Sequence, residues 1–313
     1  MAAAALTSVL PQRPADRPLV MGVVNVTPDS FSDGGRYFDA GAAVAHGHEL
    51  IAQGADIIDI GGESTRPGAQ RPTVPEELGR VIPVVEGLAD AGVWISVDTM
   101  RASVAEAAVQ SGARIINDVS GGLADPEMTS VAARTGAGFV VMHWRGHSHD
   151  MQTRAVYDDV TADVCRELAD QVGAALDAGV SREQIVIDPG LGFAKTGEQN
   201  WVLLQHLSAF QQMQLPVLVG ASRKSFLARV GSRTGGPVPA EQRDFATAAV
   251  SVVLAQADVW AIRVHDVRST FAACDVVSHI RKAHPTKFSA ASHPRYFAGT
   301  PSPRSGVSWV HDD

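Results

Sequence analysis

The sequence repeats one local pattern eight times: a short run rich in Val, Ile and Leu, then a longer alanine-rich stretch with helical periodicity. The apolar runs occupy residues 19–25, 56–60, 93–98, 114–118, 138–143, 184–188, 216–220 and 259–265. The helical stretches occupy residues 39–53, 74–91, 101–112, 126–136, 157–179, 198–212, 241–257 and 267–283. Short runs that are apolar on both faces and alternate with helices predict a parallel sheet covered on both sides.

Eight such units in about 270 residues fit a closed barrel better than an open sheet. No Gly-x-Gly-x-x-Gly follows any of the runs, which argues against a dinucleotide-binding sheet. The sequence therefore predicts an α/β protein: a single-domain (β/α)8 TIM barrel over residues 19–284 with irregular tails. Residues 1–18 are expected to form a loose N-terminal tail. Residues 285–313, rich in Pro and Ser, are expected to be disordered or loosely docked.

Composition excludes several functions. The net charge of −8 argues against binding to nucleic acids or anionic membranes. No apolar run approaches the ~20 residues that span a bilayer. The N-terminus lacks the basic start and long apolar segment of a signal peptide. Two cysteines, Cys165 and Cys274, argue against a disulfide framework and for a reducing compartment, so we expect the protein in the cytoplasm.

Polar side chains stand near the carboxyl ends of most predicted strands, where the chemistry of such barrels collects. They are Asn25, Asp59, Asp98, Asn117, His143, Asp188, Arg263 and His265, together with the run Gly-Ala-Ser-Arg-Lys-Ser at 220–225. A single such residue is equally well explained as a hydrogen-bonded plug in the barrel mouth. Eight on one rim favour a site, because burying each without a partner would be costly.

The spacing of these residues indicates what the site binds. Arg263 and His265 lie two apart, so both point the same way and suit an anion. Asp98, Asn117 and Asp188 offer acceptors and one amide, which suit a flat heterocycle with adjacent N–H donors. Asp98 is followed by a Thr and is also compatible with a helix N-cap.

The run at 220–225 predicts a helix that begins at the rim, where its free N–H groups favour an anion. Lys224 beside it can donate to a ring carbonyl. The alternative is an ordinary Ser-capped helix with solvated Arg223 and Lys224. Two further features stay open or unassigned: Asp59 supports either a loop or the barrel interior, and His-Ser-His-Asp at 147–150 lacks the spacing of a metal site.

The loop Asn-Val-Thr-Pro-Asp-Ser-Phe-Ser-Asp-Gly-Gly at 25–35 is longer than the two to about five residues of a simple turn. It carries two acids and one aromatic residue, Phe31. By itself it is either a solvated connection or part of a site.

Taken in order, seven segments resemble the dihydropteroate synthase family. They are NVTPDSFSDGG at 25–35, DIGGESTRPGA at 59–69, VDTMR at 97–101, INDVSGG at 116–122, DPGLGFAKT at 188–196, GASRKSF at 220–226 and RVHDV at 263–267. The resemblance runs from about residue 20 to 282. It implies a homodimeric transferase of folate biosynthesis that joins 6-hydroxymethyl-7,8-dihydropterin diphosphate to 4-aminobenzoate, giving 7,8-dihydropteroate and diphosphate.

The resemblance also implies three subsites. The pterin residues are Asp98, Asn117, Met142, Asp188, Lys224 and Arg263. Asp188 would accept from the 2-amino group and N3–H, Lys224 would donate to the carbonyl and N5 side, and Arg263 would lie over the ring. For the diphosphate, Asn25 would hold Mg2+ while Arg263 and His265 bind its oxygens.

The aminobenzoate residues implied by the resemblance are Phe31, Thr65, Arg66, Pro67, Phe193 and Ser225. Breaking the C–O bond to diphosphate develops positive charge on the pterin methylene, in an SN1-like step that must exclude water. Loop 25–35 would close over this cation, with Asp33 placing negative charge near it. Asp33, Arg66 and Lys224 are therefore the expected catalytic residues. Sulfonamides imitate aminobenzoate, so they are expected to target this subsite.

Two alternatives remain. A pterin-dependent methyltransferase would share the barrel and the acidic pterin contacts, but would not need the aminobenzoate loop or the Ser-Arg-Lys-Ser run. A pterin-binding paralogue with weak turnover would be signalled by loss of Asp33, Arg66 or Lys224, and all three are present.

Overall fold

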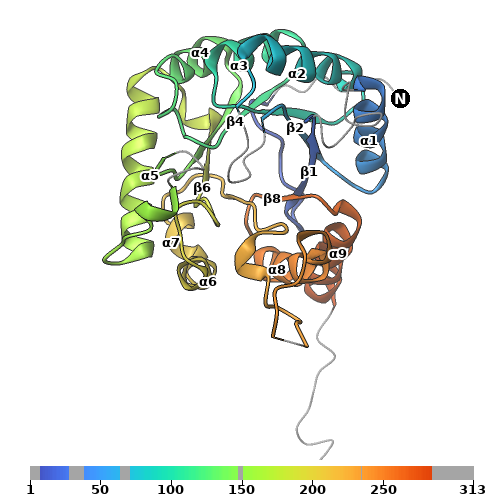
Figure 1. The fold of residues 1–313 in the computed structure, drawn as a ribbon, viewed down its shortest axis with the longest axis vertical. Helices are drawn as coiled ribbons and strands as arrows, with labels where there is room; N and C mark the ends of the chain where they lie inside the picture. Colours follow the sequence, from blue (N-terminus) through green and yellow to red (C-terminus); the bar gives the residue numbers. More distant parts are fainter. Residues whose placement is uncertain (1–7, 28–38, 64–70, 147–150, 234, 284–313) are drawn as a thin grey trace, which may run out of the picture.

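The computed structural model describes residues 8–27, 39–63, 71–146, 151–233 and 235–283 of the 313-residue chain. Eight parallel strands alternate with helices that surround them (Figure 1). The strands are β1 (Leu19–Asn25), β2 (Ile57–Gly61), β3 (Trp94–Asp98), β4 (Ile115–Asp118), β5 (Gly138–Met142), β6 (Ile185–Asp188), β7 (Leu218–Val219) and β8 (Ala261–Val264). The α-helices are α1 (Ala40–Ala52), α2 (Val74–Leu88), α3 (Ala102–Gln110), α4 (Met128–Thr135), α5 (Val160–Asp177), α6 (Gly197–Gln205), α7 (Leu207–Gln211), α8 (Asp244–Gln256) and α9 (Val267–Lys282).

The sheet closes into a barrel. Its strand order is β6-β5-β4-β3-β2-β1-β8-β7, so the first strand pairs with both the second and the last. The two end strands meet through a parallel bridge between Ile187 and Val217, and the Ile187 N–H donates to the Pro216 carbonyl at 2.9 Å. The predicted (β/α)8 barrel is confirmed.

Several helices begin where a side chain caps the first turn. Asp39, Thr73, Asp159, Thr196 and Asp266 each accept a backbone N–H of the helix that follows. These residues satisfy donors that a helix N-terminus otherwise leaves unpaired. Local sequence therefore fixes where these helices begin at the mouth of the barrel.

The sixth helical stretch differs from its prediction, because it is two helices rather than one. The break lies at His206, whose backbone leaves the helical region at φ −112° and ψ 33°. Its ring Nδ1 bonds the Val202 carbonyl at 2.8 Å, a local side-chain contact that competes with the regular helix. No helix in the described part of the chain is both long enough and apolar enough to cross a membrane.

The barrel interior is apolar at the end where the strands begin, here called the barrel floor, and side chains fill it. Side chains from all eight strands form this cluster: Leu19, Met21, Ile57, Trp94, Ile115, Val140, Val186, Leu218 and Ala261, with Trp260 just before the last strand. Leu10 packs against the cluster, and the Trp260 indole donates to the Pro11 carbonyl at 3.2 Å. The expectation of a loose tail is therefore wrong for residues 8–18, because this stretch covers the barrel floor. Residues 285–313 lie outside the described part of the chain.

Candidate active site

Above the apolar floor the barrel interior becomes polar. Side chains on a strand alternate between its two faces, so a residue two or four positions after an interior residue also points inward. Five interior apolar residues are followed this way by polar ones: Ile57 by Asp59, Trp94 by Ser96 and Asp98, Ile115 by Asn117, Val186 by Asp188, and Ala261 by Arg263. The predicted polar residues of these strands thus converge on one end of one barrel.

Arg263 joins the carboxylates on this level. Its Nε donates to Asp59 Oδ2 at 2.6 Å and its Nη2 to Asp98 Oδ2 at 2.7 Å. Asn117 Nδ2 also donates to Asp59 Oδ2, at 2.9 Å. Within the described residues, the second Asp59 oxygen and the Ser96 hydroxyl, register partners on β2 and β3, are buried without a hydrogen-bond partner. The interior therefore keeps unused hydrogen-bonding capacity beside an anchored guanidinium.

Asp188 and Lys224 face the same space from the opposite side. Asp188 Oδ1 accepts the Gly190 N–H at 2.7 Å. Lys224 donates to the Leu191 carbonyl, and its Nζ lies 4.7 Å from the centre of the Phe193 ring. The carboxylate and the ammonium are thus held by the same loop, which follows β6.

Burial gives these groups unusual acidities. It raises the pKa of Asp98 to about 7, with Arg263 opposing the shift, and it raises the pKa of Asp188 as well. It lowers the pKa of Lys224 to about 8, against the pull of Asp188. Charged groups that lose solvation without full pairing are typical of a site completed by a ligand.

An apolar wall borders the polar groups. Met142 is buried in a cluster with Met100 and Val119, and Phe193 packs against this cluster. A flat ring placed between this wall and Arg263 would contact apolar side chains on one face and a guanidinium on the other. Met142 and Phe193 therefore occupy positions consistent with their predicted contacts.

The predicted diphosphate residues lie at neighbouring strand ends. Asn25 is the last residue of β1 and pairs in register with Gly61 of β2. It lies four residues after Met21, whose side chain is in the barrel interior, so the side chain of Asn25 also points inward. His265 follows β8, and its N–H donates to Ser222 Oγ at 3.2 Å while its Nδ1 contacts the same oxygen at 2.9 Å. No cluster of three or more metal-ligating side chains occurs in the ranges that the structure describes.

Asn25 nevertheless suits Mg2+ bound through a substrate. This ion takes oxygen ligands and commonly combines one or two protein groups with phosphate oxygens and water. An inward-facing amide at the strand end supplies such an oxygen. The donor set therefore fits a metal that arrives with a diphosphate, not a protein-only cage.

The prediction for residues 220–225 needs a correction. The chain forms only the short 3-10 turn η3 (Ser225–Leu227) at the rim, and α8 begins at Asp244. So short a turn has no summed helix dipole, because that requires several aligned peptide units. Ser225 is exposed and can still meet a carboxylate, but the anion site at a helix N-terminus is wrong.

Several predicted residues lie outside the described part of the chain. They are Phe31 and Asp33 of the first loop, Thr65, Arg66 and Pro67 of the second, and the segment 147–150. Their predicted roles remain predictions.

The structure gives a place to two buried residues for which the sequence settled no role: Asp59, left open between a loop and the barrel interior, and Lys195. Asp59 is fully buried and anchors Arg263 and Asn117. Lys195 is 3% exposed and lies behind the loop that carries Gly190 and Phe193. A signal for Lys195 existed: the chain has four lysines, and this one follows the apolar, glycine-rich run 190–194.

Comparison with known proteins agrees with this geometry. The pterin binding enzyme family matches residues 21–265. A dihydropteroate synthase of Mycobacterium leprae is 52% identical over 260 residues, which cover 82% of this chain and 92% of that protein. The structure of Xanthomonas albilineans dihydropteroate synthase with 4-aminobenzoic acid superimposes with a TM-score of 0.79 at 44% identity, covering 86% of this chain and 95% of that one. The same enzyme in complex with 7,8-dihydropteroate gives a TM-score of 0.76 at 41% identity, with the same coverage.

Proposed function

The chain belongs to the pterin-binding enzyme family, and on that premise we propose that it acts as a dihydropteroate synthase. It is a transferase of folate biosynthesis. Its substrates are 6-hydroxymethyl-7,8-dihydropterin diphosphate and 4-aminobenzoate, and its products are 7,8-dihydropteroate and diphosphate. One observation carries the proposal: Asp98, Asn117, Asp188, Lys224 and Arg263 converge on one end of the barrel beside an apolar wall.

Different residues of this chain bind different edges and faces of the pterin. Asp188 has one oxygen bound to Gly190, and its other oxygen accepts from the amino and N3–H edge. Lys224 donates to the carbonyl edge, and Met142 packs on the ring. Arg263, fixed by Asp59 and Asp98, covers the opposite face without having to be ordered on binding.

The reaction exchanges one bond on the pterin methylene. The C–O bond to diphosphate breaks first and the electron pair leaves with the oxygen, so positive charge spreads into the ring. The amine nitrogen of aminobenzoate then forms the new C–N bond and loses a proton to water. A neutral amine is already nucleophilic, so no strong general base is required.

The leaving group needs positive charge around it. Arg263 and His265 bind its oxygens, and the side-chain oxygen of Asn25 would help to hold Mg2+. When bound, this ion would supply positive charge against the negative charge that develops on the leaving group. Asp33 on the first loop stabilises the cation, while Arg66 and Thr65 on the second border the aminobenzoate with Phe31, Pro67, Phe193 and Ser225.

We also propose that the enzyme is a cytoplasmic homodimer. Two cysteines without disulfides support a reducing compartment. Exposed apolar side chains on two packed helices support the dimer: Phe245 and Val253 on α8, and Val276 and Ile280 on α9. Light scattering on the purified chain tests it, and a monomer at all concentrations would contradict it.

The activity is tested with pterin diphosphate, Mg2+ and 4-aminobenzoate. We expect diphosphate release that requires both organic substrates and stops when the metal is chelated. Asp33→Ala should lower turnover and leave binding of the pterin diphosphate nearly intact. Release without condensation, or no release, would contradict the proposal. An unchanged rate in Asp33→Ala would remove that residue from the mechanism.

A further inference from the structure

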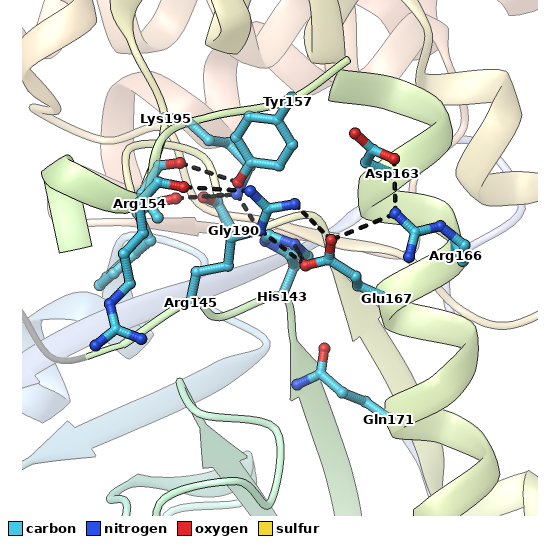
Figure 2. A network of polar contacts seen from close by, with 12 residues as sticks. His143, Arg145, Arg154, Tyr157, Asp163, Arg166, Glu167, Gln171, Gly190 and Lys195 are labelled. Atoms are coloured by element: carbon cyan, nitrogen blue, oxygen red, sulfur yellow. Dashed lines mark hydrogen bonds and ion pairs between the residues drawn. The ribbon is translucent and has the colours of Figure 1, made fainter. Parts of the chain in front are cut away.

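A second cluster of charged side chains lies on the side of the loop after β6 that Lys195 binds, here called the back of the loop (Figure 2). His143 directly follows β5 and is fully buried. Its Nε2 contacts Glu167 Oε2 of α5 at 3.0 Å, and its Nδ1 contacts Lys195 Nζ at 2.9 Å. Arg145 completes the cluster with two hydrogen bonds to Glu167. The cluster thus joins β5, α5 and the loop after β6.

The ammonium of Lys195 is fully paired. It has three N–H donors, and three acceptors surround it: His143 Nδ1 at 2.9 Å, the Gly190 carbonyl at 3.1 Å and the Phe193 carbonyl at 3.0 Å. Burial lowers the pKa of Lys195 to about 7, with Asp188 opposing the shift. When Lys195 carries its proton, His143 Nδ1 must accept, because an ammonium has no lone pair, and the Nε2–H of His143 then donates to the Glu167 carboxylate. Burial, aided by Lys195, lowers the pKa of His143 to about 3, in keeping with this neutral tautomer.

The two carbonyls that Lys195 binds belong to the residues that shape the pocket. The Gly190 N–H donates to Asp188 Oδ1, and the Phe193 ring packs against the wall that contains Met142. The fit is tight, because a Cβ on Gly190 would lie 2.4 Å from the His143 carbonyl oxygen. Gly190 has a φ of +66°, which other residues rarely adopt. A small shift of this backbone therefore moves both an acceptor for the pterin and a wall of the pocket.

Lys195 is buried, and protein acceptors already surround its Nζ, so it has no N–H donor left for a substrate. Lys224 binds the intervening Leu191 carbonyl from the pocket side. The loop is thus held between two lysines, one inside the pocket and one behind it. Tyr157 adds a third contact by donating its O–H to the Ala194 carbonyl at 2.9 Å.

We propose that Lys195 is a positioning residue: supported by His143 and Glu167, it fixes residues 190–193 so that Asp188 and Phe193 meet the pterin and aminobenzoate in reactive geometry. This inference rests on the proposed function. It predicts that loss of Lys195 changes substrate constants, not only the amount of folded enzyme.

The test compares full-length Lys195→Met, Lys195→Gln and wild type. Met keeps an unbranched chain but no donors, and Gln keeps two of the three. We expect kcat/KM for both substrates to fall about 10- to 100-fold in Lys195→Met, chiefly through higher KM, because small misplacements next to a site cost that much. Lys195→Gln should recover part of the loss. Calorimetric titration with the pterin diphosphate alone should show the same order of affinities.

The matched control is Arg166→Ala. Arg166 lies on α5, is 62% exposed, and approaches Glu167 from the solvent side at 3.7 Å without touching Lys195 (Figure 2). Its kinetic constants should equal those of wild type. Melting temperatures of all variants separate lost structure from lost positioning.

The possible outcomes are distinct. Wild-type KM values in a folded Lys195→Met overturn the inference and leave the proposed function standing. If Lys195→Met does not fold, Lys195→Gln decides: wild-type constants there overturn the inference, and raised KM values support it. A wild-type enzyme that neither binds the pterin diphosphate nor releases diphosphate removes the proposed function, and the inference with it.

Discussion

A lysine lies on each side of the loop that follows β6, and the two differ in how their ammonium groups are bonded. Lys195, behind the loop, has an acceptor for each of its three N–H donors. Lys224, on the pocket side, makes one hydrogen bond within the described ranges, to the Leu191 carbonyl, and lies over the Phe193 ring. The same contrast holds for the neighbours of each lysine. His143 and Glu167 are bonded to each other behind the loop. On the pocket side, Arg263 acts on Lys224 and is bonded to Asp59, whose second oxygen is unpaired among the described residues.

This contrast distinguishes groups that hold the loop in place from groups that bind the substrate. A buried polar group that is fully paired gains nothing from a ligand and serves to hold its neighbours in place. A buried polar group that is partly paired is costly until something completes it. We infer that the pocket side awaits a polar, planar ligand, while the back of the loop keeps the pocket in shape.

The largest expected effect is a loss of stability when Arg263, on the pocket side, is replaced by alanine. Arg263→Ala leaves the carboxylates of Asp59 and Asp98 buried side by side without their cation. The free energy of unfolding should fall by about 3 to 5 kcal/mol, as for other broken buried ion pairs. Urea denaturation measures it. Arg145→Ala is the control behind the loop, where Glu167 is partly exposed and the loss should be smaller; equal losses would contradict the distinction.

The next prediction concerns binding. Asp188→Ala and Lys224→Ala each remove a partner of the pterin, so affinity and turnover should fall together by about 100-fold, the scale of a lost charged hydrogen bond of about 2 to 3 kcal/mol. Calorimetric titration with the pterin diphosphate measures the first and diphosphate release the second. A variant with wild-type affinity and reduced turnover would move that residue from recognition to catalysis.

Two buried groups, His143 behind the loop and Asp188 in the pocket, should make opposite contributions to the slope of stability against pH. Burial lowers the pKa of His143 to about 3, below its ordinary value of 6.5, so the unfolded chain binds the extra proton and stability falls as pH falls through this range. Between pH 6.5 and 4.5 this loss is about 2 kcal/mol. Burial raises the pKa of Asp188, so that carboxyl contributes stability that is present at low pH and lost as pH rises.

These slopes are measured by urea denaturation of wild type, His143→Gln and Asp188→Asn at pH 4.5 and 6.5. Compared with wild type, His143→Gln should lose less stability on acidification and Asp188→Asn should lose more. Changes of the same sign in both variants would show that the two sides do not differ in this way.

The smallest effect is expected from Tyr157→Phe. This change removes the hydrogen bond to the Ala194 carbonyl but keeps the ring that stacks under Arg145, whose guanidinium carbon lies 3.8 Å from the ring centre. Stability should fall by about 1 kcal/mol, the usual value for one hydrogen bond. KM values should rise less than in Lys195→Met, because Lys195 still holds the loop. A larger kinetic effect than that of Lys195→Met would assign the positioning role to Tyr157.

Most of the pocket was accessible from the sequence because its residues follow a simple rule. Asp98, Asn117, Asp188 and Arg263 lie at strand ends with the inward-facing alternation, and parallel strands bring those ends together. The helix expected after residue 220 was wrong, because Gly, Ser and Lys permit a short turn as readily as a helix. The loose tail was wrong for residues 8–18 because an apolar pair such as Leu10 and Pro11 shows no period, although it fills the barrel floor.

By itself, the sequence determined the barrel, the order of its units and the identity of the residues at its mouth, since periodicity and strand-end position are local properties. Only the tertiary structure decided how those residues pair. The bonds from Arg263 to Asp59 and Asp98 join residues 204 and 165 positions apart, and the contact between Lys195 and His143 spans 52. No local pattern encodes such partners, because they follow from how the barrel closes and from how α5 packs against β5 and the loop after β6.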